Sequence, residues 1–105
     1  MAQYDVYRNP NPASRTRIPF LLDVQTDLLD SLATRVVVPL CRPGLLKGKL
    51  ADRLNPVFVV EGREFAMLTP ELAGVPGKLL GGPVANLAAG RSAIIAALDL
   101  LITGI

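Results

Sequence analysis

The sequence predicts a mostly antiparallel α+β or small-barrel domain, in which about seven short strands are followed by one helix. Short apolar runs alternate with clusters of Pro, Gly and Asn as far as residue 83. The last apolar run instead repeats its large side chains at the 3.6-residue spacing of a helix. A chain of 105 residues is long enough for one core, and we expect residues 1–105 to form a single domain.

Two strands and a basic loop are expected at the beginning of the chain. Residues 3–7 alternate in the manner of a strand, and residues 18–24 form a second strand that Pro19 interrupts early. The Asn-Pro-Asn-Pro sequence at 9–12 requires a loop between them. The patch that this loop carries is either a solvated surface or a contact for an acidic partner. Its arginines, with no acid between them, are Arg8, Arg15 and Arg17.

The densest β-branched run of the chain, RVVVPL at 35–40, predicts a core strand. We expect Pro39 to set the end of this strand, because proline cannot donate a hydrogen bond to a neighbouring strand. The basic segment at 41–54 follows, and its glycines and prolines favour short strands or a turn of helix.

A hairpin is the next expected element. The sequences PVFVV at 56–60 and EFAML at 64–68 have the composition of strands, and the Glu-Gly-Arg sequence at 61–63 supplies the turn between them. Another short strand is expected at 75–80, before a Gly-Gly-Pro sequence that breaks regular structure.

The run LAAGRSAIIAALDLLITGI at 87–105 predicts the helix around which the rest of the chain is organised. Gly104 supplies a C-terminal stop. The segment has no polar tail after Gly104, so we expect its end to be held against something or presented to a partner; a helix that simply packs on a sheet is the alternative. The expected apolar face consists of Ile94, Ile95, Leu98, Leu101 and Ile102.

Composition excludes several classes of function. The chain has no histidine and a single cysteine, Cys41, so catalytic Ser-His-Asp triads, Cys-His pairs, imidazole metal sites and internal disulfides are excluded. We expect no cofactor. Half of the residues are hydrophobic, which favours a homo-oligomer. No apolar run reaches the length of a bilayer span, and no signal peptide is visible, so we expect a cytoplasmic protein without membrane contact.

Three aspartates lie at and after the end of the second expected strand. Asp23, Asp27 and Asp30 lie close enough in sequence to pair for acid–base chemistry or to bind a divalent metal. The favoured alternative is that Asp23 and Asp27 accept backbone N–H groups at the junction of strand and turn. Leu28 and Leu29 lie within this segment, and two adjacent leucines of a strand cannot both face one core, so one of them is expected to be exposed.

A ribonuclease without histidine is a further possibility that the residues leave open. Thr34 beside Arg35, or Thr16 between Arg15 and Arg17, combines a hydroxyl with a guanidinium that could stabilise a pentavalent phosphate. The same residues are equally consistent with a threonine at a strand edge and an ion-paired arginine.

Five segments spread along the whole chain form a specific combination. They are FLLDVQTDLLD (20–30), TRVVVPL (34–40), NPVFVV (55–60), MLTPELAGVP (67–76) and LLITGI (100–105). Within them, Asp-Val-Gln-Thr-Asp is followed by Arg-Val-Val-Val-Pro-Leu and then by a closing Gly-Ile. In this combination, in the order of the segments and nearly in length, the chain resembles the CcdB toxins of bacterial toxin–antitoxin modules.

The resemblance implies a homodimer with an SH3-like barrel: a main antiparallel sheet, a small secondary sheet and a C-terminal helix. It implies a binding protein rather than an enzyme, one that enters the A-subunit dimer of DNA gyrase and traps the complex with cleaved DNA. A CcdA-like antitoxin would neutralise the toxin with a disordered acidic segment. Operator DNA would be bound only through the toxin–antitoxin complex.

The resemblance also implies site residues. The gyrase-binding set carried over by position is Leu28, Leu29, Asp99, Ile102, Thr103, Gly104 and Ile105. From charge, we expect the acidic antitoxin to contact Arg8, Arg15, Arg17 and Arg42.

One departure from the family pattern concerns Thr103, because the best-known members end in Trp-Gly-Ile. A threonine buries much less area than an indole, so gyrase would be anchored differently or more weakly. Two alternatives to a gyrase poison therefore remain. One is an endoribonuclease toxin of the related barrel type, and the other is an inactive homologue that regulates by binding the antitoxin.

Overall fold

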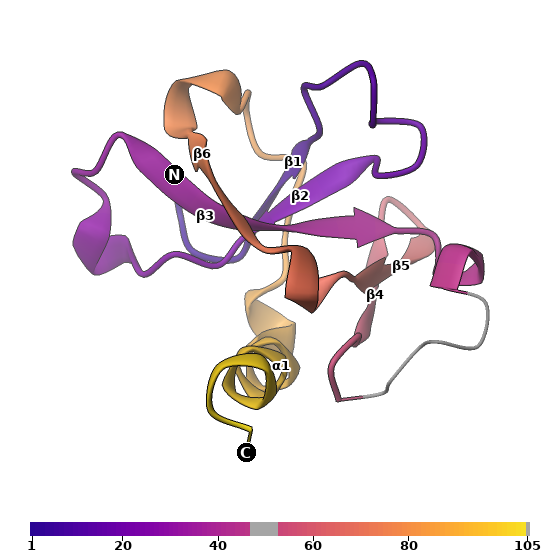
Figure 1. Cartoon of the computed structure of the whole chain (residues 1–105). Coiled ribbons are helices and arrows are strands. Elements are labelled where there is room, and N and C mark those ends of the chain that lie inside the picture. Colours follow the sequence, from indigo (N-terminus) through magenta and orange to yellow (C-terminus); the bar gives the residue numbers. More distant parts are fainter. Residues whose placement is uncertain (47–52, 105) are drawn as a thin grey trace.

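A computed structural model describes residues 1–46 and 53–104 of the chain (Figure 1). Within these residues the elements are strands, one α-helix and five short 3-10 turns. The strands are β1 (Asp5–Arg8), β2 (Phe20–Asp23), β3 (Thr34–Cys41), β4 (Val57–Val60), β5 (Arg63–Met67), β6 (Ala73–Pro76) and β7 (Ala85–Asn86). The helix is α1 (Arg91–Thr103), and the 3-10 turns are η1 (Asp27–Leu29), η2 (Pro43–Leu46), η3 (Thr69–Glu71), η4 (Gly77–Leu79) and η5 (Ala88–Gly90).

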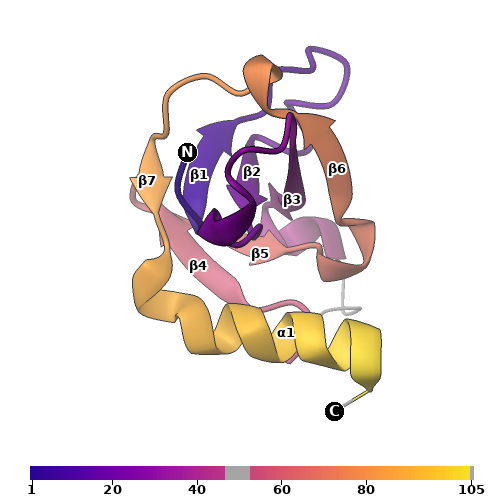
Figure 2. The same ribbon diagram turned by 90° about the vertical axis from the view of Figure 1, so that its left-hand side faces the viewer.

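The strands form one antiparallel sheet in the order β4-β5-β3-β2-β1-β7, and β6 also pairs with β3. Along one edge β3 pairs with β2. Along its other edge β3 pairs first with β6, through residues 34–37, and then with β5, through Leu40 and Cys41. The sheet curls into a nearly closed barrel with α1 across one end (Figure 2). The predicted SH3-like α+β barrel with a C-terminal helix is confirmed. The β4–β5 hairpin corresponds to the predicted small secondary sheet, and β5 joins it to β3.

Strand β3 continues through Pro39, so the prediction that Pro39 ends it is wrong. Pro39 pairs with Leu21 of β2 and its carbonyl accepts the Leu68 N–H at 2.9 Å. The N and C=O of a strand residue point to the same edge, so the missing N–H of Pro39 faces the β5 side. There it falls between the last pair with β6, at Val37, and the first pair with β5, at Leu40. No ladder bond is lost at that point.

Two other predicted strands are shifted. Strand β1 begins at Asp5 rather than at residue 3, because Tyr4 has a left-handed backbone with φ of 72°. The strand predicted at 75–80 is β6 at 73–76, followed by the turn η4. β6 ends at Pro76, which pairs with Thr34, the first residue of β3, and the chain then turns into η4 at Gly77.

The predicted hairpin is confirmed and is tighter than expected. Glu61 and Gly62 both have positive φ, 51° and 80°, which is the two-residue turn that matches the twist of the flanking strands. Arg63 therefore belongs to β5, where it pairs with Val60. In the basic segment at 41–54, η2 is the predicted turn of helix. Residues 47–52 of this segment lie outside the described part of the chain.

The sheet is covered on both faces, and β2 is buried along its whole length. On one face α1 inserts Ile94 and Ala97. The first cluster consists of Tyr4, Val6, Phe20, Leu22, Val38, Leu40, Val60, Phe65, Met67, Ile94 and Ala97. The second cluster lies on the other face and consists of Tyr7, Ile18, Leu21, Val37, Cys41, Ala66, Leu68 and Leu80.

The buried side of α1 differs from the predicted one. Ile94 and Ala97 are fully buried, whereas Ile95 and Ile102 are exposed, so their place on the packed face is wrong. Ile94, Ala97 and Leu98 follow the i, i+3, i+4 spacing of one helix face, and this face packs on the first cluster, which leaves Ile95 and Ile102 on the side toward solvent. Gly90 permits a close approach, because a Cβ there would lie 2.6 Å from the Phe58 ring.

Candidate functional site

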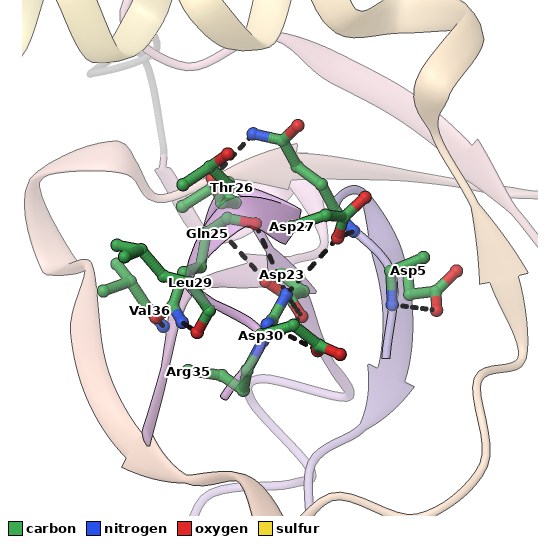
Figure 3. Close-up of polar contacts among 12 residues, drawn as sticks. Asp5, Asp23, Gln25, Thr26, Asp27, Leu29, Asp30, Arg35 and Val36 are labelled. Carbon is green, nitrogen blue, oxygen red and sulfur yellow. Dashed lines mark hydrogen bonds and ion pairs between the residues drawn. The ribbon is translucent and has the colours of Figure 1, made fainter. Parts of the chain in front are cut away.

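Asp23 at the end of β2, and Asp27 and Asp30 just after it, converge on one arginine from β3 (Figure 3). The Arg35 guanidinium is 1% exposed. Its Nε and Nη2 lie 2.8 Å from Asp23 Oδ2, and its Nη1 lies 3.3 Å from Asp30 Oδ1. Nη2 also donates to the Gln25 carbonyl at 3.3 Å, and Asp27 is farther away, at 4.0 Å. We call Arg35, Asp23, Asp30 and Gln25 the arginine cage.

Gln25 joins the cage to the surrounding backbone with both ends of its side chain. Its Oε1 accepts the Val36 N–H of β3 at 3.0 Å, and its Nε2 donates to the Leu29 carbonyl at 3.1 Å. The Gln25 N–H donates to Asp23 Oδ1 at 3.0 Å. Burial raises the pKa of the Asp23 carboxyl, although this N–H and Arg35 both favour the ionised form.

The segment at 24–33, which we call the leucine loop, is also held from outside. The Gln3 N–H donates to Asp27 Oδ1 at 2.8 Å, and the Gln3 side chain donates to the Val24 carbonyl at 3.2 Å. At the other end, the Gly77 N–H donates to the Ala33 carbonyl at 2.8 Å. Every one of these contacts is polar, and η1 at the tip of the loop has no buried residue.

The leucine loop presents apolar side chains to solvent. Leu28 is 91% exposed, and Leu29 is exposed as well, so the predicted exposure of one leucine extends to both. For the aspartates, the structure shows the contacts of the favoured interpretation. Asp23 and Asp27 accept backbone N–H groups, and within residues 1–46 and 53–104 no cluster of His, Cys, Asp and Glu could hold a metal. The buried Arg35 cannot reach an RNA phosphate beside Thr34.

The C-terminal end of α1 is a second exposed apolar tip. Ile102 is 73% exposed, and Asp99 and Thr103 are exposed beside it. The Thr103 hydroxyl donates to the Asp99 carbonyl at 2.7 Å. Gly104 has φ of 78° and its N–H donates to the carbonyls of Asp99 and Leu100, which is the predicted glycine stop. Ile105 lies outside the described residues.

The two exposed tips are separate projections of one chain. Figure 1 shows the leucine loop at the left-hand edge and the end of α1 at the bottom. The structure therefore exposes every described residue of the predicted gyrase-binding set but does not gather Leu28 and Ile102 into one patch within the chain.

Two of the predicted antitoxin-binding arginines are exposed at the edges of a pocket of about 360 Å³. Arg8 pairs with Glu61 at 2.9 Å and lies over the Phe20 ring at 5.7 Å. Arg42 lies over the Phe65 ring at 5.6 Å. The pocket is lined by Thr16, Pro19, Phe20, Arg42, Val60, Glu61, Arg63 and Phe65.

The remaining two arginines are on the loop that follows β1. Arg15 and Arg17 are exposed and flank Thr16, which lines the pocket. Burial raises the pKa of the Cys41 thiol, and the charge of Arg17 opposes this effect. Arg8 and Leu40 both pair with Phe20, the first residue of β2, so the loop before β2 lies beside the ends of β1 and β3. The structure thus brings Arg8, Arg17 and Arg42 to one end of the barrel.

Sequence reasoning missed the arginine cage and part of the exposed apolar surface. Arg35 shares the inward register of Val37 and Cys41 on β3, so a charge at that position required a buried partner, and the upstream aspartates were the candidates. Leu32 is a further exposed leucine of the loop and lines a pocket of about 590 Å³ with Met1 and Pro76.

A comparison with known protein families identifies the family of the chain. The family model described as CcdB protein matches residues 3–104. The match includes β1 to β7, α1, the arginine cage and both exposed tips. None of the helices that the structure describes is long and apolar enough to cross a bilayer. The chain belongs to the CcdB family and is a toxin of a toxin–antitoxin module.

Proposed function

We propose that this toxin binds the A subunit of DNA gyrase and traps the complex in which DNA is cleaved, without bond-making chemistry of its own. The observation that carries the proposal is the exposure of large apolar side chains at two tips, Leu28 at 91% and Ile102 at 73%, in a chain that matches the CcdB family. Burial of an exposed apolar side chain against a partner is favourable because it removes apolar surface from water, and exposed apolar surface often marks an interaction site.

We further propose that the acting unit is a homodimer. Half of the residues are hydrophobic, and several large apolar side chains are exposed outside the two tips. Two-fold pairing would repeat the leucine loop and the helix end, which matches a symmetric pair of gyrase A subunits. Sedimentation of the purified chain would measure its mass. These additional exposed side chains are Met1, Leu45, Val57, Val59 and Leu79.

A deletion tests the gyrase proposal. We expect a variant without residues 103–105 to lose growth arrest in a sensitive bacterium and to lose gyrase-dependent DNA cleavage in vitro, while its circular dichroism spectrum stays unchanged. The matched control is Ser92→Ala, an exposed residue at the opposite end of α1 from the deleted residues and outside both tips. Full DNA cleavage by the deletion variant would show that the helix end is not part of the site.

Two other outcomes would replace the proposal. Cleavage of RNA by the purified protein in the absence of gyrase would indicate an endoribonuclease, with Thr16, Arg42 and Arg63 of the 360 Å³ pocket as the residues to examine. A folded protein that binds antitoxin but causes no growth defect would indicate a regulator.

We also propose that a CcdA-like antitoxin binds the arginine surface formed by Arg8, Arg15, Arg17 and Arg42. The guanidinium groups of Arg8 and Arg42 stack on aromatic rings beside the pocket and remain exposed to an acidic segment. Such a surface speeds association with an acidic partner and discriminates against basic ones.

Charge reversal tests the antitoxin surface. Arg15→Glu combined with Arg17→Glu should weaken antitoxin binding at least tenfold at low salt, and the loss should shrink as salt is added. Arg91→Glu is the matched control, because Arg91 is exposed at the beginning of α1. An equal loss in the control, or no loss in the double variant, would remove the arginine surface from the proposal.

A further inference from the structure

We propose that Arg35 is a positioning residue that fixes the shape of the leucine loop and so presents Leu28 and Leu29 to the partner in one arrangement. The inference rests on the proposed function for the identity of that partner. The conformational part concerns this chain alone.

No buried apolar side chain holds the tip of the leucine loop. The residues of η1 are all exposed, so burial of their side chains does not favour this conformation over another. The turn itself has three local hydrogen bonds, from the N–H groups of Leu28, Leu29 and Asp30. A single 3-10 turn is marginal when it has no other support.

The arginine cage joins the tip of this loop to the core. Arg35 leaves β3 beside the buried Val37 and bonds the end of β2 through Asp23, which is 0% exposed. The same guanidinium reaches the Gln25 carbonyl at 3.3 Å and the Asp30 carboxylate at 3.3 Å, on either side of η1. One rigid planar group, together with the Gln25 side chain that donates to the Leu29 carbonyl, therefore sets the separation of the two ends of the turn.

The ion network of the arginine cage favours one conformation of the loop more than it adds stability. A buried ion pair contributes little net stability compared with apolar residues of similar size, but its directional bonds select one conformation. A loop that is already ordered loses less entropy when a partner binds it. A lysine has a single ammonium and cannot reproduce the fork that contacts Asp23, Gln25 and Asp30.

Asp30 allows the positioning role to be separated from the folding of the core. Its carboxylate is largely exposed, and its loss leaves the guanidinium bonded to Asp23 and to the Gln25 carbonyl. Asp30→Ala should therefore leave the urea midpoint unchanged, since the buried charge keeps its partner. The substitution removes the contact between Arg35 Nη1 and the Asp30 carboxylate, and the hydrogen bond from the Gln25 side chain to the Leu29 carbonyl remains.

Amide hydrogen exchange tests the conformational part. In Asp30→Ala we expect the amides of Leu29 and Leu32 to exchange at least tenfold faster, while those of β3 keep their rates. Arg35→Lys should have a similar effect on the loop, and adding Asp30→Ala to Arg35→Lys should add almost nothing, because the contact is already lost. Glu64→Ala, an exposed acid on β5, is the matched control.

Binding to the purified gyrase A subunit tests the presentation part. Asp30→Ala should weaken this binding about tenfold although Leu28 and Leu29 are intact. Unchanged exchange in both cage variants would overturn the inference, and so would faster exchange with unchanged binding. If the unaltered protein does not bind gyrase A, the proposed function fails, and the exchange rates still decide whether Arg35 fixes the loop.

Discussion

The leucine loop and the end of α1 both expose large apolar side chains, but opposite interactions hold them. The loop depends on charge: Arg35, Asp23 and the Gln25 side chain fix it from below, and no residue of η1 is buried. The helix end depends on apolar packing and backbone bonds: Ile94 and Ala97 fix the helix on the sheet, and Gly104 closes it.

This difference shows that an exposed binding side chain needs a support that is independent of it. Leu28 and Ile102 contribute almost nothing to folding, because they are mostly in water in the folded state. Substitutions of the buried residues in the supports should therefore change stability, whereas substitutions at the tips, and at the exposed Asp30, should change binding alone. Variants of the arginine cage can therefore be compared with variants of the buried face of α1, and both with variants of the exposed tips.

The largest effect is expected from breaking the arginine cage. Asp23→Ala leaves the buried Arg35 without its main partner, and the loss of one partner from a buried ion pair typically costs about 3–5 kcal/mol. Urea unfolding monitored by circular dichroism measures the loss.

The double variant Asp23→Leu with Arg35→Met tests whether charge is the reason. It removes both buried charges, so it should be more stable than Asp23→Ala alone. Equal losses in the single and double variants would show that the shape of these side chains, rather than their charge, holds the loop.

A smaller loss is expected from the helix support. Ile94 is fully buried in the first cluster, and Ile94→Ala should lower the free energy of unfolding by about 3 kcal/mol through lost burial and the cavity it leaves. Salt distinguishes the two supports: Ile94→Ala should cost as much in 1 M NaCl as at low salt. The matched control is Ile95→Ala on the exposed side of α1, which should cost about 0.5 kcal/mol or less.

The next effect is a loss of stability at alkaline pH. Burial, together with the carboxylates of Asp5 and Asp23, raises the pKa of Tyr7 from 10.0 to about 12, while Arg35 opposes this. The folded pKa lies above the unfolded one, so the stabilisation is complete below pH 10 and is lost between pH 10 and 12. The loss by pH 12 should be about 2 kcal/mol.

Tyr7→Phe provides the control for the alkaline step, because it removes the titrating phenol. The free energy of unfolding of this variant should depend less on pH between 10 and 12. The difference in absorbance at 295 nm between the unaltered protein and Tyr7→Phe follows the ionisation of Tyr7, because Tyr4 is present in both. A Tyr7 ionisation at its ordinary pKa would show that neither burial nor the carboxylates of Asp5 and Asp23 raise the pKa of this phenol.

Local signals in the sequence predicted the helix, its glycine stop, the hairpin and β3. Each depends on residues close together in the chain, such as Glu61 and Gly62 in the turn. The beginning of β1 could not be predicted, because the left-handed backbone of Tyr4 follows from its hydrogen bond to the Asp23 carbonyl of another strand. The path of β3 through Pro39 depends on a change of neighbouring strand, which is tertiary information.

The candidate site was predictable to a similar degree. Alternation indicated that Leu28 or Leu29 is exposed, and the resemblance to the CcdB family supplied the helix end. The cage was not found, because Asp23 and Arg35 are 12 residues apart and meet only when β2 pairs with β3. An arginine on the inward register of a core strand was the available signal.

The smallest effect on stability, and the sharpest test of the comparison, is expected at the tips themselves. Leu28→Ser and Ile102→Ser should each change the free energy of unfolding by less than about 0.5 kcal/mol, because both side chains are already in water. Each should nevertheless weaken binding to gyrase A, since the partner would bury these side chains. A stability loss as large as that of Ile94→Ala would mean that a tip is part of its own support, and binding losses there could no longer be separated from unfolding.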